Sequence, residues 1–126
     1  FKPDVVVLDM GDKFAKTSGF ARQDEALKAN AVHARMIAKQ YGCAIFYMSQ
    51  LSAEAEGKVI LNQAMMEGSR TGKAAEADLI IGIGKKDDWE GEEDFTRTLC
   101  ISKNKLTGWH GIITCKIVPS KSRYID

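Results

Sequence analysis

Apolar residues in this chain fall into short runs separated by polar segments, a pattern that predicts strands and helices in alternation. The first run, Val5–Leu8, shows no alternation with polar residues and ends in a carboxylate, Asp9. Continuous apolar runs are typical of strands that are buried on both faces of a parallel sheet. Ligands of open α/β sheets bind at the carboxyl ends of the strands, so we expect Asp9 to lie at a binding edge.

A βαβ unit is predicted for the first part of the chain. After a polar loop, apolar residues recur at helical spacing from about residue 22 to 41, and Gly42 is the expected stop. A second apolar run, Cys43–Met48, then leads to Ser49 and Gln50. A strand, a helix and a strand of the same kind are usually parallel, so Asp9 and Gln50 should emerge at one edge of the sheet.

The rest of the chain predicts a long loop over 51–70, a short helix over 71–77 and a third buried strand over 78–84. An acidic stretch over 85–94 is expected to be a solvated turn. Strands over 96–102 and 112–118 should form a hairpin around a basic turn, followed by a tail from Pro119. We therefore expect one α/β domain over 1–126, with a parallel sheet flanked by helices and an antiparallel hairpin at its C-terminal edge.

Composition narrows the classes of protein to which this chain could belong. With 126 residues, 44% hydrophobic residues and a formal net charge of +1, the chain fits one globular domain and has no global charge that would attract nucleic acid. Its apolar runs are shorter than the ~20 residues of a membrane span. The three cysteines are scattered, which predicts reduced thiols, and together with the absence of a signal-like segment this indicates the cytoplasm.

One segment, Gly68–Lys73, imitates a phosphate-binding loop. The motif requires G-x-x-x-x-G-K-[ST] directly after a buried strand. Here the glycine spacing is one residue short, Lys73 is followed by Ala74, and no strand precedes the segment. We reject it as a P-loop, so a nucleotide cradle would have to come from another segment.

Several further residues are candidates for phosphate contacts. Gln50 follows a buried strand, and Lys103 and Lys105 lie two residues apart beside the basic turn. Lys58, Arg70 and Lys73 could contact a nucleic-acid backbone. Taken singly, each of these residues is more typical of an ordinary solvated surface.

In combination, four motifs resemble the RecA-like motor of DnaB-type hexameric replicative helicases of bacteria and phages. "VVVLD" matches the Walker B strand, and "FYMSQL" resembles the strand that ends in the phosphate-sensing Gln or His. "EGSRTGKAAEADLIIGI" is similar to the segment of glycine and arginine, short helix, "AD" and strand, and "ISKNKLTGWHG" to the basic hairpin. The motifs occur in the family's order and cover nearly the whole chain.

The resemblance implies roles for individual residues. Asp9 would hold Mg²⁺ through water, Gln50 would sense the γ-phosphate of ATP or another NTP, and Lys103 and Lys105 would reach a neighbour's site. The family's arginine finger falls at Lys105, and a lysine lacks the guanidinium fork. Either Lys105 serves in its place, or Lys103 carries the role, or the finger is lost. The mobile DNA-binding loops would correspond to 51–70, although the residue match there is poor.

The resemblance also implies that this chain is the C-terminal half of a motor domain, because the family's Walker A loop and catalytic glutamate lie upstream of Walker B. We therefore expect part of an NTP-driven DNA helicase, acting on single-stranded DNA as a homohexamer in a bacterial cell or phage-infected host, and no ATP hydrolysis by these residues alone. Two alternatives remain open: a fragment of a recombinase or clock-type ATPase, and a non-catalytic RecA-like binding module.

Overall fold

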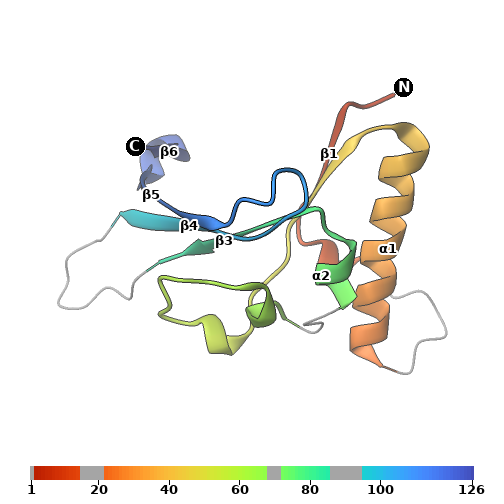
Figure 1. Cartoon of the computed structure of the whole chain (residues 1–126), viewed down its shortest axis with the longest axis horizontal. Helices are drawn as coiled ribbons and strands as arrows, with labels where there is room; N and C mark the ends of the chain where they lie inside the picture. Colours follow the sequence, from red (N-terminus) through yellow and green to blue (C-terminus); the bar gives the residue numbers. More distant parts are fainter. Residues whose placement is uncertain (1, 15–21, 68–71, 86–94) are drawn as a thin grey trace. The chain divides into compact units, whose positions relative to one another are not determined.

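The computed structural model describes residues 2–14, 22–67, 72–85 and 95–126. It is a mixed α/β structure with a two-stranded parallel sheet and a four-stranded antiparallel sheet (Figure 1). The chain divides into two compact units, each of which is described by itself. The first unit comprises Phe1–Ser52 and Met66–Ala77, and the second comprises Ala53–Met65 and Asp78–Asp126.

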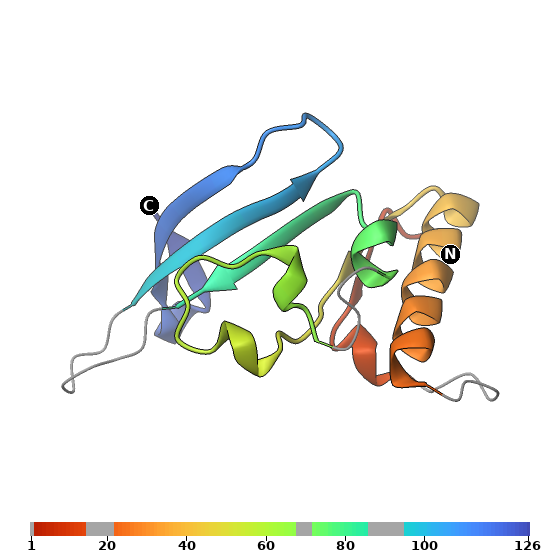
Figure 2. The same cartoon turned by 60° about the horizontal axis from the view of Figure 1, so that its bottom comes forward.

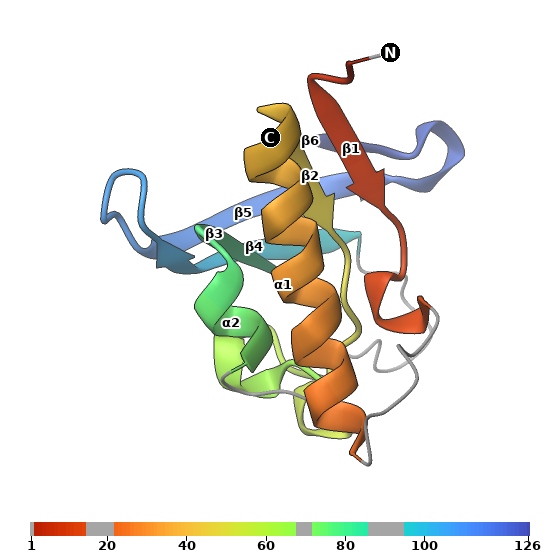
Figure 3. The same cartoon turned by 90° about the vertical axis from the view of Figure 1, so that its right-hand side faces the viewer.

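The βαβ prediction for the first unit is confirmed. Strand β1 (Val5–Leu8) pairs in parallel with β2 (Ala44–Tyr47), from Val5 opposite Ala44 to Leu8 opposite Tyr47. Helix α1 (Gln23–Tyr41) connects them and lies beside the two strands (Figure 3). Both strands consequently end at the same edge.

The end of α1 follows from one glycine. Gly42 adopts the left-handed conformation with φ 63°, which costs a residue without a Cβ little, and its N–H donates to the carbonyl of Ala38. The side chains that α1 buries are small or apolar and lie in the first two-thirds of the helix: Ala26, Leu27, Ala31 and Ala34. The apolar pattern continues to Ile37 and Tyr41, but those side chains are exposed.

The expectation that the first two strands are buried on both faces is wrong for the described residues. Along β1 and β2 the burial alternates, and Val5, Val7 and Phe46 are 53%, 56% and 59% exposed. The register places Val5 opposite Ala44 and Val7 opposite Phe46, so these residues share one sheet face. An apolar run therefore predicted the strand correctly, but could not tell whether both faces are covered.

The short helix predicted over 71–77 is observed as α2 (Gly72–Glu76), and it packs against α1. Arg35 of α1 ties the two helices together. Its guanidinium donates to the carbonyl of Glu76, and its Nε lies 3.9 Å from the Glu76 carboxylate. This connection fixes the end of α2 within the first unit.

The second unit is a meander of four strands in the order β3 (Leu79–Gly84), β4 (Thr96–Asn104), β5 (Gly111–Val118) and β6 (Arg123–Ile125). Figure 2 shows β3, β4 and β5 side by side.

The predicted hairpin of β4 and β5 is confirmed. The third strand was expected in the parallel sheet. Among the described residues it instead pairs antiparallel with β4, which a run of apolar residues cannot reveal. The tail also forms the short strand β6, which was not predicted.

The segment Ala53–Met65, which includes the 3-10 turns η2 (Ala53–Ala55) and η3 (Gln63–Met65), packs on this second sheet. A Cβ on Gly82 would lie 2.8 Å from Cβ of Leu61, and one on Gly84 would overlap the carbonyl oxygen of Val59. The Thr98 hydroxyl donates to that same carbonyl. Because Gly82 and Gly84 have no side chains, the segment Ala53–Met65 can pack closely on the sheet.

Among the described residues, no helix combines the length and the apolar character needed to cross a membrane.

Candidate functional site

The carboxyl ends of β1 and β2 carry Asp9 and Gln50, as the sequence predicted. The pairing continues past the strands, because N–H of Met48 donates to the Leu8 carbonyl at 3.1 Å and N–H of Gly11 donates to the Met48 carbonyl at 3.0 Å. Asp9 and Gln50 are both exposed. Two polar side chains are thus presented at the edge where α/β sheets bind ligands.

A sharp turn follows Asp9 and returns the chain to the end of β2. Met10 adopts a left-handed conformation (φ 51°, ψ 51°), which is uncommon for a residue with a side chain. It starts the 3-10 turn η1 (Gly11–Lys13), in which Gly11 is buried. A Cβ on Gly11 would lie 2.5 Å from the Tyr47 ring, so only glycine fits under this ring.

This turn brings Asp12 into a compact polar cluster with Ser49 and Lys73. The Lys73 ammonium donates to Asp12 at 2.9 and 3.0 Å and to Ser49 Oγ at 2.7 Å, and Ser49 Oγ lies 2.6 Å from Asp12 Oδ2. The side chains of Lys73 and Asp12 are only 4% and 13% exposed. A buried charge of this kind is tolerated when it is paired and hydrogen-bonded, as it is here.

Tyr47 completes the cluster from the last position of β2. Its hydroxyl donates to Asp12 Oδ1 at 3.3 Å. Burial, followed by the charge of Asp12 and the hydrogen bond to it, raises the pKa of the Tyr47 phenol well above its usual range. Tyr47 therefore acts as a protonated donor at any physiological pH.

Gln50 is held by its backbone on both sides. Its N–H donates to Asp12 Oδ2 at 3.3 Å, and its carbonyl accepts from the N–H of Glu67 at 3.1 Å. The adjacent residues Leu51 and Met66 form an isolated antiparallel bridge. Gln50 thus lies at the root of the long loop, where the chain leaves β2 and returns.

The contact between Ser49 and Lys73 does not form an activated nucleophile. A lysine that activates serine must accept its proton, whereas this ammonium donates to both Asp12 oxygens and to Ser49. Ser49 in turn lies within hydrogen-bond distance of a carboxylate. The cluster is therefore an ion pair that fixes geometry, and the exposed groups beside it are those available for chemistry.

A metal ion held by protein ligands alone does not fit the described residues, since no three His, Cys, Asp or Glu side chains there are grouped to hold one. Mg²⁺ usually retains several waters and binds through one or two carboxylates together with the phosphates of a substrate. The single exposed carboxylate of Asp9 at a strand end fits that second mode.

The hairpin of the second unit carries Lys103 and Lys105. A register shift between Ile80 and Ile81 leaves one extra residue in β4 just before Lys103, and bulges of this kind redirect the following side chain. The strand ends at Asn104, so Lys103 belongs to β4 and Lys105 lies in the turn that follows it. The N–H of Lys105 donates to the Asp78 carbonyl at 2.8 Å.

Asn104 organises this turn. Its Nδ2 donates to Thr107 Oγ1 at 2.8 Å and to the Trp109 carbonyl at 3.1 Å, while its Oδ1 accepts from the N–H groups of Leu106 and Thr107. The side chains of Leu106 and Trp109 are exposed. One asparagine therefore fixes the conformation of the tip that follows both lysines.

The residues expected to contact DNA are placed differently from one another. Lys58 is exposed in the second unit, within the segment Ala53–Met65 that packs on the sheet. Arg70 lies outside the described residues. Lys73 is in the first unit, and its ammonium is buried against Asp12 instead of facing solvent. We therefore assign Lys73 to the polar cluster, while the roles of Lys58 and Arg70 stay predictions.

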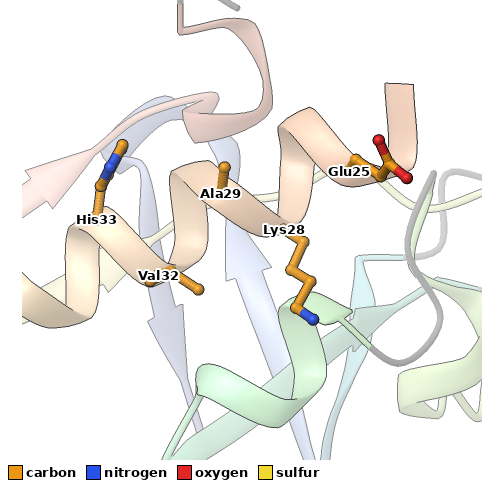
Figure 4. Close-up of a pocket in the computed structure, with 5 residues that line it drawn as sticks. All are labelled: Glu25, Lys28, Ala29, Val32 and His33. Carbon is orange, nitrogen blue, oxygen red and sulfur yellow. The ribbon is translucent and has the colours of Figure 1, made fainter. Parts of the chain in front are cut away.

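A shallow hollow on α1 is lined by Glu25, Lys28, Ala29, Val32 and His33 (Figure 4). All of these residues come from one helix, and none was a candidate from the sequence. Because no second element supplies a converging polar group among the lining residues, we assign no function to this hollow.

Sequence reasoning missed Asp12, and it gave Lys73 a different role. Asp12 stands in a stretch that reads as an ordinary polar loop, and its partner is 61 residues away in the chain. The available signal was indirect: an aspartate shortly after an apolar strand end and a lysine in a short predicted helix. Pairing them required the left-handed turn at Met10, which is not predictable from a methionine.

Comparison with known proteins gives a likeness to solved structures only. No protein-family model matches the chain, and no curated protein matches it. Among solved structures, the chain is similar to one described as an "ATPase Domain", with a TM-score of 0.82 and 16% identity, over 97% of this chain and 44% of that chain.

A second similar structure is described as "The Structure Of A DnaB-Like Replicative Helicase And Its Interactions With Primase". It matches with a TM-score of 0.79 and 17% identity, over 96% of this chain and 30% of that one. The present chain therefore spans less than half the length of either structure. At this identity the likeness shows the fold alone: nearly the whole chain has the fold of a part of each of these two structures.

Proposed function

We propose that this chain is part of the motor of an NTP-driven replicative DNA helicase that works as a homohexamer. The observation that carries the proposal is the position of Asp9 and Gln50 at the ends of two adjacent parallel strands, within a fold shared with a DnaB-like helicase over 96% of the chain. These two strand ends are where a RecA-like motor is expected to hold and sense a nucleotide.

In this proposal Asp9 holds Mg²⁺ through water beside an NTP. When bound, the ion neutralises charge on the phosphates. The exposed carboxylate at the end of β1 supplies an anionic anchor for its water ligands. In this proposal the phosphate cradle comes from another segment, because Gly68–Lys73 does not fit a P-loop.

Gln50 is proposed to hydrogen-bond the terminal phosphate or the attacking water. Its side chain is exposed, and its backbone is held at both the N–H and the carbonyl. Because the loop over 51–67 starts and returns at Gln50, a change at the phosphate would be transmitted to that loop. Lys58 and Arg70 of the same loop region are proposed to contact the backbone of single-stranded DNA.

Lys103 and Lys105 are proposed to reach the nucleotide of a neighbouring subunit. They lie at the end of β4 and in a turn that Asn104 keeps in one conformation. A preorganised cation stabilises the charge that develops during phosphoryl transfer without further reorganisation. Lys105 therefore takes the place of an arginine finger.

The test is an assay of DNA unwinding and DNA-stimulated NTP hydrolysis by the full-length protein, with Asp9→Asn as the decisive variant. We expect near-normal folding and a loss of turnover by orders of magnitude, since the metal's water ligands lose an anionic partner. Asp4 is an exposed carboxylate at the opposite end of β1, so Asp4→Asn is the matched control and should leave turnover unchanged. Turnover without unwinding would favour a recombinase or clock-type ATPase, and binding without turnover would favour a non-catalytic module.

A further inference from the structure

The backbone of Gln50 is fixed by a buried ion pair that the proposed chemistry does not itself use. The Asp12 carboxylate accepts from the N–H of Gln50 at 3.3 Å, and the same oxygen lies 2.9 Å from the Lys73 ammonium. On the other side, the Gln50 carbonyl accepts from the N–H of Glu67. The peptide groups on both sides of the candidate sensor are therefore clamped.

The components of this clamp come from three separate parts of the first unit. Asp12 follows β1, Ser49 follows β2, and Lys73 is the second residue of α2, which begins just after the loop region returns. With side chains only 4% and 13% exposed, Lys73 and Asp12 cannot separate within the fold without leaving a buried charge unpaired, which is strongly unfavourable. Such a pair holds one arrangement instead of a range of arrangements.

We propose that Asp12 and Lys73 are positioning residues that hold Gln50 in the orientation needed to meet the terminal phosphate, and that they link this orientation to the start of α2. This inference rests on the proposed function of Gln50. A side chain that must approach a phosphate within hydrogen-bond distance is sensitive to small shifts of its own backbone. Loss of the ion pair frees the N–H of Gln50 and shifts the root of the loop.

The experiment uses Lys73→Met and Asp12→Asn in the full-length protein, with Arg35→Met as the matched control. Arg35 also ties α2 to the rest of the first unit, but it does so through Glu76 at the other end of that helix. We expect kcat of DNA-stimulated hydrolysis to fall roughly 10- to 100-fold in both test variants, with KM for NTP within about twofold of wild type. The control should keep its kcat.

Combination with Gln50→Ala separates positioning from general support of the fold. If Lys73 acts through Gln50, Lys73→Met should cause little further loss of kcat in the Gln50→Ala background, because coupled residues are not additive. A full additional loss in that background would overturn the proposal. If Lys73→Met fails to fold, the double variant Asp12→Asn/Lys73→Gln, which removes both charges and keeps hydrogen-bonding groups, takes its place in the same cycle.

A readout without hydrolysis keeps the inference separate from the proposed function. Hydrogen exchange of the Gln50 amide should accelerate in Lys73→Met and remain unchanged in Arg35→Met. Unchanged exchange in Lys73→Met would overturn the clamp. Faster exchange together with full turnover by Gln50→Ala would leave the clamp standing but remove Gln50 from the reaction, and with it the proposed role of the pair in catalysis.

Discussion

The two units of the molecule hold their candidate polar groups near a sheet in different ways. In the first unit, a two-stranded parallel sheet ends in a buried cluster in which Asp12 and Lys73 neutralise each other. In the second unit, a four-stranded antiparallel sheet carries its candidate groups, Lys58, Lys103 and Lys105, on loops or at a strand end.

The difference indicates a division of labour between the units. A parallel sheet brings the ends of successive strands to one edge, so it gathers groups that must act on one ligand. An antiparallel hairpin instead carries its tip away from its own sheet and stabilises it by local bonds, as Asn104 does here. Under the proposed function, the first unit holds a subunit's own nucleotide, and the second supplies Lys103 and Lys105 for contact with a neighbour and Lys58 for contact with DNA.

The largest expected effect concerns Lys105, which acts across a subunit boundary in this interpretation. Lys105→Ala should leave nucleotide binding close to normal and lower kcat by roughly 10³ or more, as expected for finger residues. Lys105→Arg should retain or improve turnover, because a guanidinium can form two hydrogen bonds to phosphate. DNA-stimulated hydrolysis measures both variants, and Lys116→Ala, an exposed lysine on β5, is the control.

Mixed oligomers sharpen the Lys105 prediction. Subunits with Lys105→Ala mixed with subunits carrying Asp9→Asn should recover some activity, because an intact Asp9 site can then meet an intact Lys105. If no ratio restores hydrolysis and Lys105→Ala alone leaves kcat unchanged, the hairpin is only a solvated turn. The proposed division of roles between the two units would then be wrong.

The next largest effect concerns the packing of Ala53–Met65 on the second sheet. Gly84→Ala would place a Cβ against the Val59 carbonyl, so we expect a destabilisation of roughly 1–3 kcal/mol. Chemical denaturation measures this change, with Thr114→Ala on the exposed part of β5 as the control within about 0.5 kcal/mol of wild type. A silent Gly84→Ala would mean that this segment does not pack closely on the sheet.

A smaller effect is expected for DNA binding. Lys58→Ala and Arg70→Ala should each weaken binding of single-stranded DNA and reduce the slope of log affinity against log salt by about 1. Lys39→Ala, exposed near the end of α1, should change neither quantity. Affinity that stays constant for both test variants across a salt titration would remove the loop from the path of DNA.

The smallest effect is expected from Tyr47→Phe, which removes one long hydrogen bond to Asp12 and should cost about 0.5 kcal/mol. Because the pKa of Tyr47 is raised on folding, the unfolded chain releases this proton first as pH rises above about 10, and stability should fall from there. Tyr47→Phe has no phenol to titrate, so its stability should fall less steeply above this pH. Unfolding experiments at several alkaline pH values measure the difference. An identical alkaline slope in both proteins would contradict the buried position of the phenol.

Much of the first unit was predictable because its signals are local. The helical spacing that ends at Gly42, and the apolar runs that became β1 and β2, together fix a βαβ unit, and the parallel pairing places Asp9 and Gln50 at one edge. Each of these steps depends on residues within one or two elements. The resemblance to helicase motors added the roles of these residues but did not alter their positions.

The features that were not predicted depend on pairing between residues far apart in the chain, which local sequence patterns do not reveal. Strand β3 is as apolar as β1, yet it pairs with β4 in an antiparallel sheet. Asp12 meets Lys73 only because Met10 turns the chain with a positive φ. The burial of Lys73 was also not predicted, because a lysine in a glycine-bearing segment is ordinarily exposed.

The uncovered face of the parallel pair has a consequence for handling the protein in solution. Val5, Val7 and Phe46 place apolar side chains on one side of two strands, each of which has one sheet neighbour among the described residues. Exposed apolar strands with unpaired edges are templates for intermolecular pairing. Preparations of these residues alone should therefore self-associate as their concentration rises, and a charged residue in place of Phe46 should delay precipitation.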